Sequence, residues 1–167
     1  MGKSLKTEPA EIFLKLRNMV LSTIAAPTSA PAGVWAVVME MGYPQGSATL
    51  VSIADGTVSV YFSGGGGVIG LGEHASPREA SKSLLALAPN FLKFCQETHS
   101  YPLPKPNCTR FYLRTNEKTV TDEAKTDDLG NNRHSLSPLF HKAHELLTAV
   151  RLVDEELRKK KSGAPSA

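Results

Sequence analysis

The glycines of residues 64–72 are the sequence feature with the clearest capacity for ligand chemistry. Gly65, Gly67 and Gly70 have the spacing G-x-G-x-x-G between an expected strand and an expected helix. Backbone without Cβ atoms can approach a phosphate closely, and the unpaired N–H groups of a helix N-terminus favour an anion. One interpretation is therefore a site for a phosphate or a nucleotide. Its candidate ligand-binding residues are Gly64, Gly65, Gly66, Gly67, His74, Ser76 and Arg78.

The other interpretation of the same glycines is structural, and the motif context favours it. The helix of a dinucleotide site begins inside the motif, whereas the helix cap expected here is Ser76. No Lys-Ser or Lys-Thr pair directly follows the glycines, which excludes a P-loop. We therefore expect a glycine turn or a bulged edge strand over 68–71.

No other constellation in the sequence predicts catalysis or metal binding. His141 and His144 are three residues apart, which is not the H-E-x-x-H spacing of zinc enzymes. The acidic residues of 122–128 lack the EF-hand spacing and are expected to be solvated. Cys95 is expected on the apolar side of a helix, and Cys108 has no neighbour in the sequence that would activate it. We expect a protein without catalytic residues, metal or cofactor.

Composition restricts the protein class. The chain has 167 residues, 41% of them apolar, which suits one domain over 1–157. The cations of 158–161 account for the whole net charge of +3, so the body offers no basic face and nucleic acid is not expected as a partner. Residues 158–167 are expected to be a basic, disordered tail, although 158–161 also suit the solvated end of a helix.

The location expected from the sequence is cytoplasmic. Lys15, Arg17 and Asn18 interrupt the apolar run that a secretory signal would need, and no run of about 18 apolar residues could span a membrane. Two cysteines are too few for a disulfide framework, which favours a reducing compartment.

Hydrophobic spacing predicts the elements of the fold. A helix is expected over 8–24, capped by Thr7 and with Ile12, Phe13, Leu16, Met19, Val20 and Ile24 on its apolar stripe. Three strands are expected over 34–41, 47–54 and 57–62, with a type I′ turn at Asp55-Gly56. A helix with a capping box at Ser76 should run to about 98 and break at Pro89, followed by an extended connector over 101–106. A hairpin over 109–123, a long loop over 122–134 and a helix from Ser137 complete the chain.

This order, helix, three strands, helix, two strands, helix, predicts an α+β domain with a five-stranded, mainly antiparallel sheet covered by helices. The order resembles that of the profilin-like and roadblock group of folds, in which a central five-stranded sheet carries helices on its faces. The resemblance covers most of the chain and rests on the order of the elements.

The function expected from these observations is that of a non-catalytic protein-interaction or regulatory accessory domain. An amphipathic first helix and a half-exposed sheet offer surfaces for a protein partner or for self-association. The alternative is a small-ligand binding protein or small enzyme that uses the glycine-rich loop 64–72 and the helix N-terminus at 76.

Overall fold

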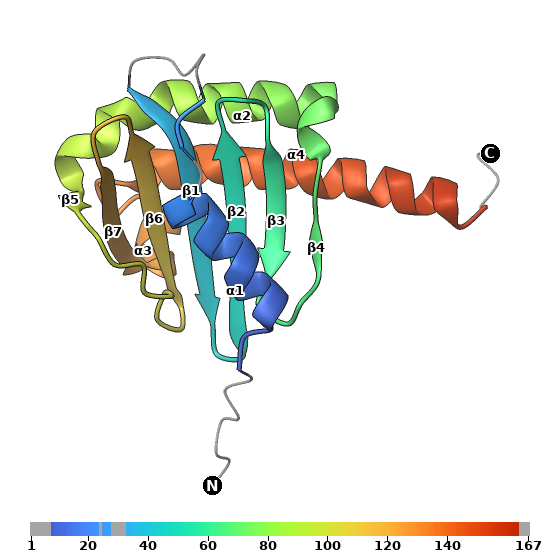
Figure 1. Cartoon of the computed structure of the whole chain (residues 1–167), viewed down its shortest axis with the longest axis horizontal. Coiled ribbons are helices and arrows are strands. Elements are labelled where there is room, and N and C mark those ends of the chain that lie inside the picture. Colours follow the sequence, from blue (N-terminus) through green and yellow to red (C-terminus); the bar gives the residue numbers. More distant parts are fainter. Residues whose placement is uncertain (1–7, 24, 28–32, 164–167) are drawn as a thin grey trace, which may run out of the picture.

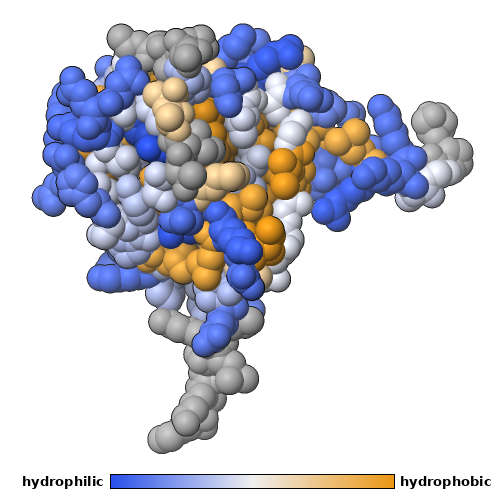
Figure 2. All heavy atoms as spheres, viewed as in Figure 1, coloured by the Kyte–Doolittle hydropathy of each residue, from blue (hydrophilic) through white to orange (hydrophobic). Residues whose placement is uncertain are grey.

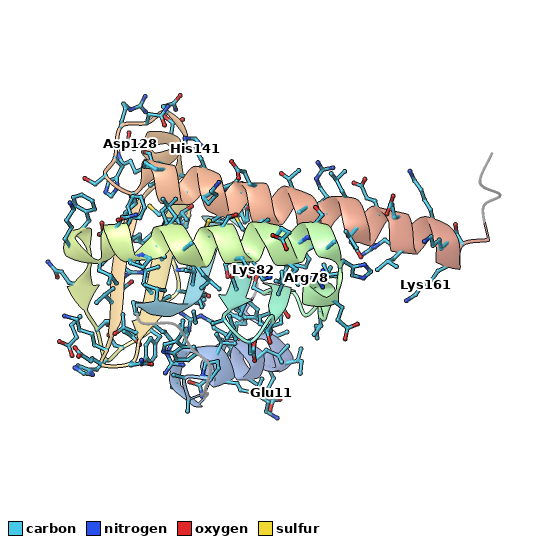
Figure 3. The ribbon with its side chains drawn as sticks, turned by 90° about the horizontal axis from the view of Figure 1, so that it is seen from above. Glu11, Arg78, Lys82, Asp128, His141 and Lys161 are labelled. Carbon is cyan, nitrogen blue, oxygen red and sulfur yellow. The ribbon has the colours of Figure 1, made fainter. Side chains whose placement is uncertain are left out.

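A computed structural model describes residues 8–23, 25–27 and 33–163. In this part of the chain a single α+β domain is built on one antiparallel sheet of seven strands, in the order β4-β3-β2-β1-β6-β7-β5. Helix α1 lies on one face of the sheet, and α2 and α4 lie side by side on the other (Figures 1 and 3). The expectation of an antiparallel α+β domain is confirmed, but the expected number of five strands is wrong.

Strands β1 (Val34–Tyr43), β2 (Gly46–Ile53), β3 (Val58–Phe62) and β4 (Gly67–Val68) form a meander. On the other side of the central strand β1 lies the hairpin of β6 (Cys108–Thr115) and β7 (Thr119–Lys125), and β5 (Gln96–Glu97) pairs with β7 at the outer edge. Nearly all of β1 is buried because both of its faces are covered, which explains its continuous apolar sequence. Strand β5 is absent from the sequence prediction, whereas β4 overlaps at Val68 the glycine turn or bulged edge strand expected over 68–71. Both strands are two residues long and lie at the two sheet edges.

The larger core lies between the sheet and the helices α2 (Ala75–Leu87) and α4 (Ser137–Lys161). The 3-10 helices η2 (Leu71–Glu73) and η3 (Ala88–Phe94) precede and follow α2. Pro89 stands at the start of η3, so the break expected there is confirmed. The core face of α4 consists of Leu139, Phe140, Ala143, Leu146 and Val150.

The smaller core lies under α1 (Glu11–Asn18) and the π-helical segment η1 (Met19–Thr23). The apolar stripe expected for the first helix is wrong in part. Phe13 and Val20 are buried, but Ile12 and Met19 are exposed, and Arg17 takes a buried place instead. The expected cap Thr7 and the stripe residue Ile24 lie outside the described residues.

Several local expectations are corrected. Gly56 has a φ of +98°, but Asp55 is not among the residues with positive φ, so the β2–β3 hairpin has a three-residue loop with a glycine bulge rather than a type I′ turn. Helix α2 begins at Ala75 with His74 as its N-cap and without a side-chain cap, so the capping box at Ser76 is wrong. The loop expected over 122–134 contains the end of β7 and the short helix α3 (Thr126–Gly130).

The end of the chain also differs from the tail expected over 158–167. Arg158, Lys159, Lys160 and Lys161 form the last turn of α4, which extends past the β4 edge of the sheet (Figure 1). These cations are therefore the solvated end of a helix. Residues 164–167 of the expected tail lie outside the described residues.

Among the described residues, every helix is too short or too polar to cross a membrane.

Candidate functional site

An apolar groove lies between α1 and the β3–β4 edge of the sheet, and we call it the edge groove. Its volume is about 140 Å³. The lining consists of Ile12, Phe13, Leu16, Tyr61, Phe62, Gly65, Gly66, Gly67 and Ile69. Figure 2 shows apolar side chains gathered on this face of the molecule, beside and below α1.

The walls of the edge groove carry three of the large apolar side chains that the domain leaves in solvent. Ile69 is 66% exposed, Ile12 52% and Phe62 46%. Phe13 and Tyr61, by contrast, are buried and belong to the smaller core. A contiguous apolar patch of this kind, unlike a single exposed leucine, marks a surface that another molecule can cover.

The backbone along one side of the edge groove belongs to an open sheet edge. Among the described residues, strand β4 pairs only with β3, through Val60–Val68 and Tyr61–Gly67. The amide of Phe62 donates to the carbonyl oxygen of Gly66 (2.8 Å). Hydrogen-bonded pairs alternate along an antiparallel ladder. The N–H and C=O of Gly67 therefore point away from β3, where an added strand could bind them.

A buried ion pair fixes α1 above the sheet. Arg17 donates two hydrogen bonds of 2.7 Å, from Nε and Nη2, to the carboxylate of Glu40 on β1. The hydroxyl of Thr49 donates to the same carboxylate (2.7 Å), and Arg17 Nη2 also donates to the carbonyl oxygen of Tyr101 (2.6 Å). Burial by itself would lower the pKa of Arg17, but the hydrogen bond and charge of Glu40 outweigh it, so the pKa is raised and the guanidinium stays charged.

A second cation holds the segment that follows α1. Arg114 on β6 donates from Nη1 to the carbonyl oxygen of Val20 (2.7 Å), and its guanidinium lies 4.4 Å from the centre of the Trp35 ring. Together with Arg17 this contact sets the height and angle of α1. The position of the groove wall thus depends on two arginines that reach across the α1 face.

A larger cavity of about 320 Å³ lies beside the start of α1, and we call it the proline cavity. Four segments form it: the entry to α1, the β1–β2 turn with the start of β2, the residue that follows β3, and the connector over 101–106. Its lining consists of Glu8, Pro9, Tyr43, Pro44, Gln45, Gly46, Ser47, Ser63, Leu103, Pro104 and Pro106.

The residues predicted for a phosphate site are separated along strand β3. Gly65 has a φ of +105° in the turn that follows Phe62, and the amide of Gly65 donates to the carbonyl oxygen of Phe62 (2.9 Å). At the other end of β3, a Cβ on Gly72 would overlap the carbonyl oxygen of Gly56. The segment that leads into α2 therefore lies against the β2–β3 loop. Strand β3 has five residues. A strand of that length spans roughly 15 Å, so the glycines of 64–66 lie far from His74, Ser76 and Arg78.

The glycines allow the backbone to pass close to neighbouring backbone along the sheet edge. A Cβ on Gly67 would lie 2.6 Å from the carbonyl oxygen of Val60, which β4 approaches closely. Arg78 Nη1 lies 3.5 Å from the carbonyl oxygen of Glu73 and is exposed. Of the seven candidate residues, the described cavities include only Gly65, Gly66 and Gly67, all three in the edge groove.

The remaining reactive groups do not converge. His144 is half-buried against the Phe140 ring (centroids 4.2 Å apart), while His141 is exposed and bonds to Asn132 (2.9 Å). Within the described ranges no three His, Cys, Asp or Glu side chains are placed to hold a metal ion. Burial and the charge of Asp122 raise the pKa of the Cys95 thiol to about 12.

The sequence interpretation missed both surface features for identifiable reasons. The sequence predicts Ile12 on the buried stripe and Ile69 in a glycine turn or a bulged edge strand. The prolines of 101–106 predict only an extended connector. A signal was present, because prolines and a tyrosine recur in segments that flank strands, but only tertiary structure shows that these segments meet.

Comparison with known proteins gave no similarity: the chain matches no family model, no curated protein and no solved structure.

Proposed function

We propose that the protein is a non-catalytic protein-interaction domain that binds an extended, apolar segment of a partner protein at the edge groove. The bound segment adds a strand to β4 and places alternate apolar side chains between Ile12, Phe62 and Ile69. The observation that carries the proposal is the open edge of β4 beside these three exposed apolar side chains. Strand addition of this kind derives affinity from backbone hydrogen bonds and specificity from pockets for alternate side chains.

Rigidity of the groove supports the proposal. The Arg17–Glu40 pair and the contact of Arg114 with Val20 hold α1 in place, so a partner would not have to order the groove wall on binding. A preformed surface of this kind reduces the entropic cost of association. The groove is too small to bury a whole domain face, which favours a short segment as its occupant.

A random peptide display library, selected on the immobilised full chain, tests this proposal. Enriched peptides should contain apolar residues at alternate positions and should protect the amides of 66–70 from hydrogen exchange. Ile69→Asp should weaken their binding at least about 10-fold, because a charge would then face the apolar side chain of the peptide. Phe94→Asp is the control, since Phe94 is also a large exposed apolar residue but lies in η3, next to the strand at the opposite sheet edge.

Peptides that bind the Ile69→Asp variant as tightly as the original chain would contradict the proposal, and so would a selection without enrichment. Sedimentation of the chain alone tests self-association, the other kind of interaction expected from the sequence. A dimer that Ile69→Asp dissociates would identify a second copy of the chain, instead of another protein, as the occupant of the groove.

The alternative of a phosphate or nucleotide site receives no comparable support. Its glycines and its charged residues lie at opposite ends of β3, and neither the edge groove nor the proline cavity contains His74, Ser76 or Arg78. The edge groove uses three of the same glycines, at 65–67, for apolar contact instead.

A further inference from the structure

We infer that the proline cavity binds a small, uncharged aromatic or alicyclic molecule that carries a hydrogen-bond acceptor. This inference goes beyond the proposed interaction with a protein segment, because the cavity shares none of its lining residues with the edge groove. It rests on three properties of the cavity: fixed walls, an apolar lining of suitable volume, and one buried hydroxyl with a proton to donate.

The walls are fixed by backbone hydrogen bonds that join segments distant in the sequence. The amide of Ala10 donates to the carbonyl oxygen of Ser63 (2.8 Å). The amide of Ser63 in turn donates to the carbonyl oxygen of Ser47 (2.9 Å). On the connector side, the amide of Asn107 donates to the carbonyl oxygen of Gly42 (2.9 Å). The backbone of β1 also lies very close to the connector at this point, since a Cβ on Gly42 would overlap the carbonyl oxygen of Lys105.

The lining suits a compact ring. Pro9, Pro44, Pro104 and Pro106 present rigid aliphatic rings, which lose almost no conformational entropy on contact with a ligand. Leu103 and the half-exposed ring of Tyr43 complete the apolar surface. The cavity volume is about 320 Å³. That volume lies at the small end of the range for ligand pockets, which begins at roughly 300 Å³.

Ser63 supplies the polar group that would orient such a ligand. Its residue is only 9% exposed, and its Oγ accepts a hydrogen bond from the amide of Ser47 (2.8 Å). The structure shows no hydrogen bond donated by this hydroxyl to a described residue. A buried hydroxyl gains free energy when its proton finds an acceptor, so an acceptor on the ligand should bind here.

The charge at the rim restricts the ligand further. Glu8 is the charged residue in the lining, and it is exposed. An anionic ligand would be repelled by this carboxylate in a cavity with low polarity. A neutral acceptor such as an amide or ketone oxygen therefore suits the site better than a carboxylate.

Three aromatic probes test these properties of the ligand separately: benzene has the ring alone, benzamide adds a neutral acceptor, and benzoate adds a charged one. Each is titrated into the full chain while backbone amide NMR shifts are recorded. Benzamide should shift the amides of Gly46, Ser47, Ser63 and Lys105 with saturation in the millimolar range. Benzene should shift the same amides with lower affinity, because it offers no acceptor, and benzoate should bind most weakly.

The Ser63→Ala variant tests the role of the hydroxyl. It should weaken benzamide binding roughly 3- to 10-fold, the worth of one hydrogen bond, and leave benzene binding unchanged. Ser59→Ala is the matched control, because Ser59 is a buried serine of β3 that does not line the cavity. A purely structural effect of the Ser63 change would instead weaken both probes equally.

Absence of localised shifts with benzamide would overturn the inference, as would equal loss of benzamide and benzene binding in Ser63→Ala. The Ile69→Asp variant keeps this outcome separate from the proposed function. It should weaken peptide binding at the edge groove and leave the benzamide titration unchanged.

Discussion

Arg17 on α1 and Glu40 on the central strand β1 form a buried, two-point ion pair, with both N–O distances at 2.7 Å. Glu40 is fully buried and Arg17 nearly so. A polar contact thus lies at the centre of the interface that attaches α1 to this face of the sheet. Because desolvation is costly, such a pair fixes orientation more surely than it adds stability.

Loss of one partner of this pair should be more harmful than loss of both. Glu40→Leu should destabilise the fold by about 3–5 kcal/mol, because the guanidinium of Arg17 would then be buried without a counter-charge. The double variant Arg17→Leu with Glu40→Leu should recover part of that loss. Urea unfolding of the three proteins measures the difference.

The exposed pair of Lys15 and Glu11 provides the control for that comparison. Their side chains lie 3.5 Å apart on the solvent side of α1. Lys15→Leu should change the free energy of unfolding by less than about 1 kcal/mol. A double variant less stable than Glu40→Leu alone would contradict this prediction, because it would show that Arg17 stabilises the fold without its counter-charge.

Acid should destabilise the domain through His144. Burial and the nearby charge of His141 lower the pKa of His144 below its ordinary value of 6.5, and its Nε2 has no hydrogen-bond partner among the described residues. Below that ordinary value the unfolded chain therefore binds a proton that the folded state resists, so the free energy of unfolding falls as the pH falls. This loss continues until the pH reaches the lowered pKa of the folded state.

Urea midpoints at pH 7.5, 6.5 and 5.5 test that slope. His144→Leu should flatten the decline between pH 6.5 and 5.5. His99→Gln should leave it intact, because His99 is almost fully exposed. An unchanged slope in His144→Leu would assign the acid sensitivity to other groups.

The glycines of 64–72 should differ sharply in their tolerance of a side chain. A Cβ on Gly67 would press on the backbone carbonyl of Val60, whereas nothing lies within 4 Å of the Cβ position of Gly64. Gly67→Ala should therefore cost about 1–3 kcal/mol through overpacking. Gly64→Ala should lie within about 0.5 kcal/mol of the original chain, as is usual for an open surface position. Equal effects at both positions in urea unfolding would contradict the close approach of β4 to β3.

Cys95 should be inert in the folded protein. Its thiol has a pKa of about 12. Only about one thiol in 10⁴ is then ionised at pH 8, and the thiolate is the reactive form. In a Cys108→Ser variant, the single remaining thiol should react with Ellman's reagent slowly in buffer and completely in denaturant. Rapid reaction in buffer would show that η3 opens to expose the thiol.

Local sequence patterns were reliable where one backbone preference dominated. The apolar run of β1, the Asp55-Gly56 hairpin, the break at Pro89 and the helix that begins at Ser137 are all present. In each case neighbouring residues carry the relevant preference, so no distant contact was needed. The type of turn at Asp55-Gly56 was wrong because register with β3, and not the dipeptide alone, sets the loop length.

Patterns failed where a distant partner decided the outcome. The side of α1 that is buried could not be read from hydrophobicity, because Arg17 faces the sheet only by virtue of Glu40, which is 23 positions away in the chain. The edge strands β4 and β5 are too short for periodicity to detect. The candidate ligand residues were close in sequence but are separated by the length of β3.

The amino-acid sequence by itself determined the class of the domain, the antiparallel course of its main strands and the location of most of its helices, because those depend on local backbone preference and on the period of apolar residues. Tertiary structure alone decided which apolar residues remain outside and which loops meet. Surfaces such as the edge groove and the proline cavity are formed by segments far apart in the chain, and their proximity follows from the packing of the whole sheet and not from any single segment.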